Sequence, residues 1–341
     1  MRRLRVLLLI HHYLVPPDDV SEIDTSTQTW RTEYDVLRTL RDDLKHDVRV
    51  LGVADELTPI KQAAEEFKPH IVFNLLEAFH EVGTYDQNVV SYLELLRLPY
   101  TGCNPRGMIL ARDKSLSKKL LQYHRISVPE FAVAKRGRKF KLPKRMGFPL
   151  IVKSLTEEAS IGISQASVVE DERRLLERIQ FIHDSIKTDA IIEQYIEGRE
   201  LYCCIVGNER LQVFPIWEMF FEKMTDRQHR IATSRVKWSS KYQDKAGIMT
   251  GAAEPLPEGV QERLPAMCKR VYRSLMLSGY ARIDMRLDGT GRVWVIEANP
   301  NPQIANGEDF ARAADMADLT YAQLIQRILT AGLRWEPERS G

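Results

Sequence analysis

The feature that most restricts the fold is a pair of alternating strands near the end of the chain. They run from Ala281 to Asn299 on either side of the turn sequence Asp288-Gly-Thr-Gly291. A two-residue turn at Thr290-Gly291 would make them an antiparallel hairpin. Successive side chains of a strand point to opposite faces, so Ile283 and Met285 are expected to face a core. The other face of the hairpin is polar.

The polar face of this hairpin brings like charges together. The expected register places Asp284 opposite Glu297 and Arg282 opposite Asn299. Directly opposed side chains have Cβ atoms about 4.5–5.5 Å apart, where two carboxylates repel each other unless something neutralises them. Mg²⁺ prefers one or two carboxylates together with phosphate oxygens, so Asp284, Glu297 and Asn299 are candidate ligands. A solvated acidic hairpin remains the alternative for an Asp/Glu pair taken alone.

The composition is that of a globular protein with more than one core. A chain of 341 residues predicts two or three domains or lobes. The 49 Lys and Arg against 47 Asp and Glu leave a formal net charge of +2, which favours neither nucleic acid nor membrane as a partner. No stretch approaches the roughly 18 apolar residues of a membrane span, and Val6 to Ile10 is too short for a secretion signal. The four cysteines show no metal-binding spacing, so we expect buried thiols in a cytoplasmic protein.

Strand and helix patterns alternate over the first part of the chain. Strands are predicted at Arg5 to Ile10, Val48 to Val53 and Ile71 to Leu75, separated by helices at Trp30 to Leu44 and Pro59 to Phe67. This βαβαβ order predicts a parallel sheet with helices on its faces.

The predicted organisation has three lobes, over residues 1–104, 105–188 and 189–335. The last lobe contains the polar segment Glu218 to Gly251, which shows no sustained period and is rich in Arg, Lys and Gln. Because long structureless segments are uncommon inside compact domains, we expect it to be either a disordered segment or a lid over a functional site.

Two further stretches place charged side chains at strand ends. Lys153 ends the apolar strand that begins at Gly147, where an unpaired ammonium would be costly and a phosphate would compensate it. Glu193-Gln194 ends another strand, and Glu200 begins the next. Such an edge can hydrogen-bond an adenine through its backbone and a ribose through a carboxylate. An ordinary exposed hairpin is the alternative.

Taken in order, these motifs resemble the ATP-grasp superfamily, and within it the D-alanine:D-alanine ligase branch. The matching parts are Asp113-Lys114, Phe-Pro-Leu-Ile-Val-Lys153, Ser160-Ile-Gly162, Glu193-Gln-Tyr-Ile196 with Glu200, Lys241-Tyr242, Arg282-Ile-Asp284 and Glu297-Ala-Asn299. The resemblance implies a Rossmann-like N-terminal lobe followed by two ATP-grasp α+β lobes, with the nucleotide between those two.

The resemblance also implies roles for individual residues. Lys114 and Lys153 would hold the α- and β-phosphates, residues 193–196 (Glu193, Gln194, Tyr195, Ile196) the adenine, and Glu200 the ribose. Asp284, Glu297 and Asn299 would bind two Mg²⁺ ions, for which Mn²⁺ could substitute. The catalytic set would be Arg282, which would steady the transition state, Lys241 at the γ-phosphate, Tyr242 and Ser160.

Several positions depart from the family pattern where it contacts substrates. Ala159 replaces the first of two serines in the small loop. The loop from Asn74 to Gly83 is longer and differently charged than the family's, so we expect its His80 and Glu81 to contact the substrate. Glu308 and Asp309 replace a Ser-Leu pair whose serine binds the carboxylate of the second substrate in the family.

The resulting functional prediction is an ATP-dependent ligase that joins a carboxylate to an amine through an acyl phosphate, acting on small amino-acid-like substrates. The acids at Glu308 and Asp309 would repel a free D-alanine carboxylate, so substrates other than a pair of D-alanines are expected. The alternative is that these acids point into solvent or cap a helix that begins near Asp309. The alternatives are an ATP-grasp kinase or peptide-modifying ligase, and a regulatory protein that binds nucleotide without turnover. A homodimer is one option for the assembly.

Overall fold

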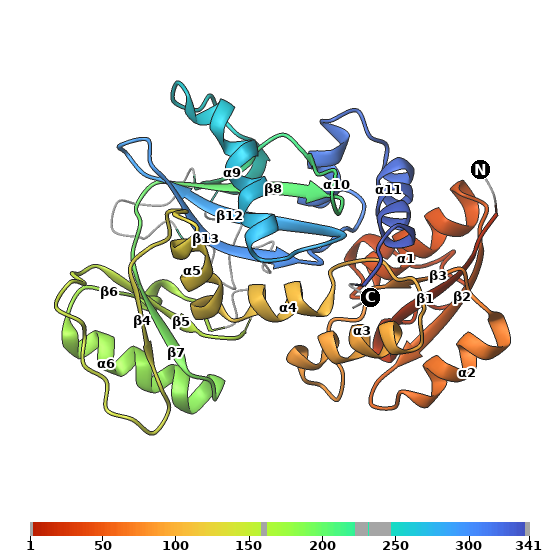
Figure 1. The fold of residues 1–341 in the computed structure, drawn as a ribbon, viewed down its shortest axis with the longest axis horizontal. Coiled ribbons are helices and arrows are strands. Elements are labelled where there is room, and N and C mark those ends of the chain that lie inside the picture. The colour runs from red at the N-terminus through yellow and green to blue at the C-terminus, as the bar shows by residue number, and fades with distance from the viewer. Residues whose placement is uncertain (1–2, 158–161, 222–230, 232–246, 338–341) are drawn as a thin grey trace.

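The computed structural model describes residues 3–157, 162–221, 231 and 247–337. In that part of the chain the strands form three sheets, and Figure 1 shows them with their helices as three lobes. The mixed α/β class predicted from the sequence is confirmed. The helices are α1 (Arg31–Arg38), α2 (Thr58–Phe67), α3 (Asp86–Leu95), α4 (Pro105–Arg112), α5 (Lys114–Tyr123), α6 (Glu172–Phe181), α9 (Val260–Ser274), α10 (Asp309–Asp315) and α11 (Tyr321–Leu333).

The N-terminal sheet is parallel, with the order β2-β1-β3, as the βαβαβ pattern predicts. Its strands are β1 (Arg5–His11), β2 (Asp47–Val53) and β3 (Ile71–Asn74). The central strand β1 is completely buried from Val6 to Ile10. One of its faces packs against Val36 of α1 and the other against Ile60 of α2, which explains why this strand is a continuous apolar run.

The central sheet is antiparallel, with the order β4-β7-β5-β6. Its strands are β4 (Phe131–Ala134), β5 (Leu150–Ser154), β6 (Val168–Val169) and β7 (Ala190–Gln194). Leu175 and Ile179 of α6 form a buried cluster with Val152 and Ile192 on one face of the sheet. By alternation, Lys153 lies on the opposite face.

The C-terminal sheet has the order β11-β10-β8-β12-β13, with β9 paired to β8. Its strands are β8 (Arg199–Val206), β9 (Gln212–Val213), β10 (Trp217–Phe221), β11 (Ile248–Ala252), β12 (Tyr280–Leu287) and β13 (Val293–Pro300). Leu264 and Cys268 of α9 pack on one face, in a cluster with Cys203 and Ile283. All four cysteines are buried free thiols, as expected.

The predicted absence of regular structure between Glu218 and Gly251 was wrong at both ends of that segment. Strand β10 occupies its beginning and strand β11 its end, and the two pair antiparallel from Trp217↔Ala252 to Phe221↔Ile248. The β-forming run Trp-Glu-Met-Phe-Phe was too short to stand out in a polar context. Residues 222–230 and 232–246 lie outside the described part of the chain.

The N-terminal and C-terminal lobes share one core. Leu324 and Ile328 of α11 lie in a single buried cluster with Phe73 of β3 and Cys204 of β8, and Figure 1 shows α11 between the two lobes. Helices α3 and α4, which the sequence patterns did not predict, connect the N-terminal sheet to α5. The two lobes are therefore fixed to each other by packing.

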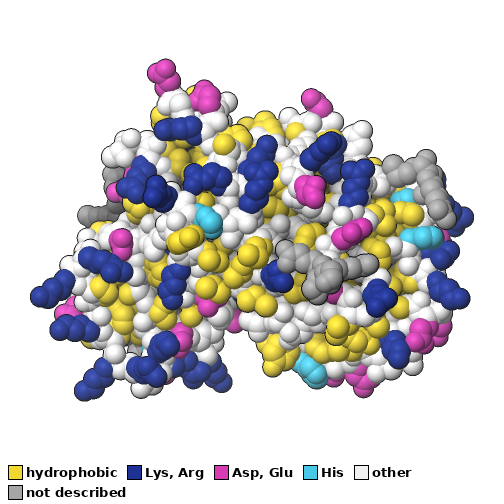
Figure 2. Space-filling model, viewed as in Figure 1, with side chains coloured by type: hydrophobic (Ala, Val, Ile, Leu, Met, Phe, Trp, Pro, Cys, Tyr) yellow, Lys and Arg dark blue, Asp and Glu magenta, His cyan; other side chains and the backbone are white. Residues whose placement is uncertain are grey.

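The surface seen in Figure 2 carries no patch of a single charge. Lys and Arg side chains are spread over all three lobes, with Asp and Glu side chains between them. This distribution agrees with the near balance of 49 basic and 47 acidic residues. Within the described residues, no helix combines the length and the apolar character that crossing a membrane requires.

Candidate active site

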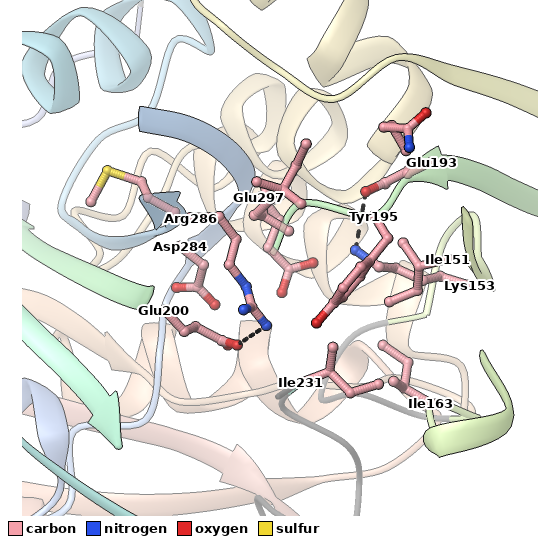
Figure 3. Close-up of a pocket in the computed structure, with 14 residues that line it drawn as sticks. Ile151, Lys153, Ile163, Glu193, Tyr195, Glu200, Ile231, Asp284, Arg286 and Glu297 are labelled. Atoms are coloured by element: carbon pink, nitrogen blue, oxygen red, sulfur yellow. Dashed lines mark hydrogen bonds and ion pairs between the residues drawn. The ribbon is translucent and has the colours of Figure 1, made fainter. Parts of the chain in front are cut away.

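A pocket lies between the central sheet and the C-terminal sheet, and we call it the inner pocket (Figure 3). Apolar side chains from both sides line it, namely Ile151, Ile163, Tyr195, Ile196, Ile231, Met285 and Ile296. Its charged lining residues are Lys153, Glu193, Glu200, Asp284, Arg286 and Glu297. An apolar slot with a few convergent charges is typical of a site for a small molecule with a flat apolar part and a charged part.

The predicted pairing across the hairpin is confirmed. In the β12–β13 hairpin Asp284 pairs with Glu297 and Arg282 with Asn299. The predicted two-residue turn was wrong, because Asp288 donates its backbone N–H to the carbonyl of Arg292 at 3.0 Å and so encloses three residues.

A β-bulge restores the register that the longer turn would have shifted. Met285 pairs with Val295, while Asp284 pairs with Glu297, so Ile296 is the extra residue on β13. The bulge therefore decides which side chain faces Asp284. Without it, the residue opposite Asp284 would be Ile296 and the two carboxylates would lie on opposite faces.

Arg282 is held directly by Asp284. Its Nε donates to Oδ1 at 2.7 Å and its Nη2 to Oδ2 at 2.9 Å, and its guanidinium lies 4.6 Å from the centre of the Tyr202 ring. Burial alone would lower the pKa of Arg282, but the charge and hydrogen bonds of Asp284, together with smaller effects of Tyr202 and Cys204, raise that pKa above its usual range. The arginine is therefore a fixed positive charge at this position.

Lys153, for which the sequence analysis named a phosphate as partner, is paired with a carboxylate of the protein itself. Its Nζ lies 3.1 Å from Oε2 of Glu193, on the neighbouring strand β7. The Oε1 of the same carboxylate lies 3.4 Å from Nζ of Lys118 on α5. Burial would raise the pKa of Glu193, but the two lysines lower it, so the carboxylate stays ionised between them.

The sequence analysis missed Arg286, which lines the inner pocket, and Lys118, which contacts Glu193 of its lining. Lys118 follows Lys114 by four residues on α5, so both project from one face of the helix. Arg286 follows Asp284 by two residues on β12 and donates to Oε2 of Glu200 at 2.9 Å. The spacing of four residues on the helix and of two residues on the strand was the sequence signal that could have identified them.

Glu200 is placed as a hydrogen-bonding group at the edge of the inner pocket. Besides Arg286, it accepts a hydrogen bond from the hydroxyl of Tyr202 at 2.9 Å. Gln194 and Tyr195, at the end of β7, also line the pocket. The structure thus brings together the predicted Glu193-Gln-Tyr-Ile196 stretch and Glu200.

A second cavity, which we call the outer cleft, lies between the N-terminal lobe and the C-terminal sheet. Arg282 and Asn299 line it from the hairpin, and Glu77 lines it from the loop after β3. Other charged lining residues are Asp86, Arg112, Glu157, Glu308, Asp309 and Arg312. The inner pocket and the outer cleft meet along β12, where Arg282 faces the cleft and Asp284 the pocket.

Glu308 and Asp309 both reach the outer cleft, and each already has a partner. Glu308 Oε1 lies 2.9 Å from Nη1 of Arg31. Asp309 begins α10, and its Oδ1 accepts from the indole of Trp217 at 3.0 Å and from the hydroxyl of Thr250 at 2.6 Å.

His80 and Glu81 are not among the residues that line the outer cleft. Both have left-handed backbone conformations, at φ values of 54° and 58°, in the tight turn closed by the Phe79–Val82 bridge. The Glu81 carboxylate turns instead toward His11, at 3.8 Å. From this loop, Glu77, Gly83 and Thr84 reach the cleft.

Three predicted catalytic residues, Ser160, Lys241 and Tyr242, lie outside the described part of the chain, as does Ala159. Ile231, from the predicted lid segment, is described and is buried in the wall of the inner pocket.

The hairpin offers oxygen donors that suit a hard cation. No group of three or more His, Cys, Asp or Glu side chains is placed to bind a metal among the described residues. Here the oxygen donors are two opposed carboxylates and the amide oxygen of Asn299. Mg²⁺ commonly takes one or two carboxylates and completes its shell with substrate phosphates and water, so this set fits it.

Comparison with known proteins agrees with this geometry. The family model described as "D-ala D-ala ligase C-terminus" matches residues 119–330. The chain is 29% identical over 272 residues to the uncharacterized protein y4sG of Sinorhizobium fredii, covering 77% of this chain and 75% of that one. It is 30% identical over 256 residues to a D-alanine–D-alanine ligase of Desulforudis audaxviator, covering 74% and 78% of the two chains.

The fold is that of a solved ligase structure. The D-alanine–D-alanine ligase of Bacillus anthracis complexed with ATP superposes with a TM-score of 0.74 at 24% identity, over 97% of this chain and 98% of that one. Fold and site together therefore define an ATP-grasp protein. More particularly, the chain belongs to the D-alanine–D-alanine ligase family, and it is an ATP-dependent ligase.

Proposed function

We propose that this ligase joins a carboxylate to an amine through an acyl phosphate. The observation that supports this most directly is the meeting of two cavities on one strand. Asp284 and Glu297 face the inner pocket, and Arg282 and Asn299, one step along the same strands, face the outer cleft. A terminal phosphate of ATP held at Asp284 and Glu297 would lie beside the carboxylate of a substrate bound in the outer cleft. An in-line phosphoryl transfer needs this arrangement.

The inner pocket is proposed to hold ATP. The backbone of residues 193–196 would bind the adenine between Ile151 and Met285, and Glu200 would bind the ribose. Lys153 would turn from Glu193 to the phosphates, together with Lys114, whose Nζ lies 3.9 Å from Oε2 of Glu297.

Asp284, Glu297 and Asn299 are proposed to hold two Mg²⁺ ions, for which Mn²⁺ could substitute. Bound metal would neutralise the phosphates and so let an anionic carboxylate approach them. Arg282 would keep its bond to Asp284 and direct its remaining N–H groups at the charge that develops on the transferred phosphoryl group.

The proposed reaction has two steps. A substrate carboxylate oxygen attacks the γ-phosphorus, the bond from that phosphorus to the bridging oxygen breaks, and ADP leaves. The amine nitrogen then attacks the acyl carbon, inorganic phosphate leaves, and the nitrogen releases a proton. A kinase would stop after the first step, so dependence on the amine separates the two candidates.

The amine substrate is proposed to differ from D-alanine. Glu308 stands where the family is expected to carry a serine, whose hydroxyl can donate a hydrogen bond to a carboxylate. An ionised glutamate offers only acceptors. A cationic or neutral polar group suits this position better.

The test is a panel of small carboxylates and amines, supplied in pairs with Mg-ATP, with ADP release measured and products identified by mass spectrometry. The proposal expects ADP release that needs both partners and a product with a new amide bond. Release that needs only one partner, with a phosphorylated product, would instead support a kinase.

A further inference from the structure

We propose that Lys118 is a positioning residue of the nucleotide and metal site, and that it acts by fixing Glu193 and the bulge at Ile296. This inference rests on the proposed function, because it concerns how the same inner pocket is organised. Lys118 does not line that pocket, so it would act through the residues that do.

Lys118 is buried to a degree that is unusual for lysine. It is 1% exposed, and it ranks among the largest fully buried side chains of the chain. A buried ammonium persists only where it is paired and hydrogen-bonded. The two contacts of its Nζ, with Glu193 and with the backbone of β13, meet that requirement.

The first contact keeps Glu193 in place. Glu193 is 1% exposed and lies between Lys118 and Lys153. If Lys153 turns to the nucleotide phosphates, Glu193 loses one of its two counterions. Lys118 would then hold that buried carboxylate, so that Lys153 can be released without leaving an unpaired charge behind.

The second contact fixes the bulge. The Nζ of Lys118 donates to the backbone carbonyl of Ile296, the extra residue that places Glu297 opposite Asp284. The preceding residue, Val295, donates its N–H to the carbonyl of Ser127 at 2.9 Å, which ties the strand to the segment that follows α5. Helix α5 and the segment after it thus hold both residues of the strand at the bulge.

Both effects converge on the metal ligands. Outer partners that orient metal ligands are worth roughly tenfold to a hundredfold in metal affinity. Loss of Lys118 should therefore reduce the gain in ADP affinity that Mg²⁺ produces. It should also weaken metal-free ADP binding, because Lys153 would remain with Glu193.

The experiment compares calorimetric binding of adenosine, of ADP without metal and of ADP with Mg²⁺. The variants are Lys118→Met and the exposed control Lys119→Met on the same helix. Lys118→Met is expected to lower affinity for Mg-ADP by about tenfold or more while adenosine binds as in wild type. Unchanged Mg-ADP affinity, or an equal loss for adenosine, would overturn the proposal.

A second variant covers the case in which Lys118→Met does not fold. The double variant Lys118→Met with Glu193→Gln has no carboxylate at position 193 that would be left without Lys118. Lys153 then has no ion pair with Glu193 to break before it binds the phosphates. In this double variant, the increase in ADP affinity that Mg²⁺ produces should be smaller than in Glu193→Gln alone. The reason is that the carbonyl of Ile296 has lost its hydrogen-bond donor. An increase in ADP affinity with Mg²⁺ as large as that of Glu193→Gln alone would overturn the proposal. If wild type binds no Mg-ADP, the proposed function fails as well, whereas equal binding by all variants refutes only the role of Lys118.

Discussion

The guanidinium of Arg31 lies 2.9 Å from the carboxylate of Glu308, across the junction between the N-terminal lobe and the turn before α10. Arg31 also donates to the carbonyl of Asn306, and Asp35 accepts from the backbone N–H of Asn306 at 2.9 Å. This network holds a carboxylate in the wall of the outer cleft. It links residues 277 positions apart in the sequence.

Replacing Glu308 should change substrate preference more than stability. Its side chain is 40% exposed and that of Arg31 is 26% exposed, so their pair should contribute no more than about 1 kcal/mol to the free energy of unfolding. We expect Glu308→Ser to gain activity with carboxylate-bearing amines and to lose it with diamines or basic amino acids. The measurement is the specificity constant for each class of amine.

The exposed Glu258→Ser variant serves as the control for this substitution. If Glu308→Ser leaves the specificity constants for both classes of amine unchanged, Glu308 serves only as the ion-pair partner of Arg31, and the argument on specificity fails.

The opposed acids of the hairpin should be needed for turnover but not for folding. Asp284→Asn and Glu297→Gln should each lower kcat on the order of 10²–10³, because each removes a charge-stabilising contact. The exposed Glu262→Gln variant on α9 is the matched control. A hairpin variant that turns over at the wild-type rate, with its circular dichroism unchanged, would refute the metal-binding role.

Much of the hairpin could be predicted because alternation alone assigns side chains to faces. Asp284 and Glu297 were paired correctly although the turn was one residue longer than expected, since the bulge at Ile296 compensates. Bulges leave little trace in a single sequence, so this agreement was partly fortuitous.

Contacts between distant segments could not be predicted. Arg31 on α1 contacts the turn before α10, and Lys118 on α5 contacts Glu193 and the backbone of Ile296, and no local sequence pattern predicts such contacts. The sequence analysis named a phosphate as the partner of Lys153 and missed Glu193 for the same reason, because Glu193 reaches Lys153 only through the pairing of β5 with β7. The lysine spacing on α5 was visible but uninterpretable without that sheet.

Glu33 should make stability depend on pH. Burial, backed by the charges of Glu77 and Asp35, raises its pKa from 4.5 to about 7, and its buried Oε2 has no hydrogen-bond partner. The folded state therefore binds a proton that the unfolded state releases near pH 4.5. The contribution of Glu33 to the free energy of unfolding is therefore fully present below pH 4.5 and is lost as the pH rises through about 7.

Glu33→Gln should remove that dependence. From pH 5.5 to pH 8 the wild type should lose roughly 2 kcal/mol more of its free energy of unfolding than the variant does. Urea unfolding at the two pH values measures this. Parallel pH profiles for the two proteins would mean that Glu33 is not protonated in the folded state.

Mg-ATP should raise the melting temperature, because a ligand that binds only the native state stabilises it by mass action. Binding at one hundred times the dissociation constant contributes about 2.7 kcal/mol. Thermal melting with and without millimolar Mg-ATP measures this, with Mg²⁺ alone as the control. A melting temperature that Mg-ATP leaves unchanged would contradict the assignment of the inner pocket.

The acyl phosphate is the central claim, and oxygen transfer tests it most directly. A carboxylate substrate from the active pair is labelled with ¹⁸O in its carboxyl group, and the inorganic phosphate released with Mg-ATP and the amine is analysed by mass spectrometry. If the carboxylate oxygen attacks the γ-phosphorus, one labelled oxygen is carried into the phosphate when the amide forms. Phosphate without label, released alongside an amide product, would contradict the mechanism.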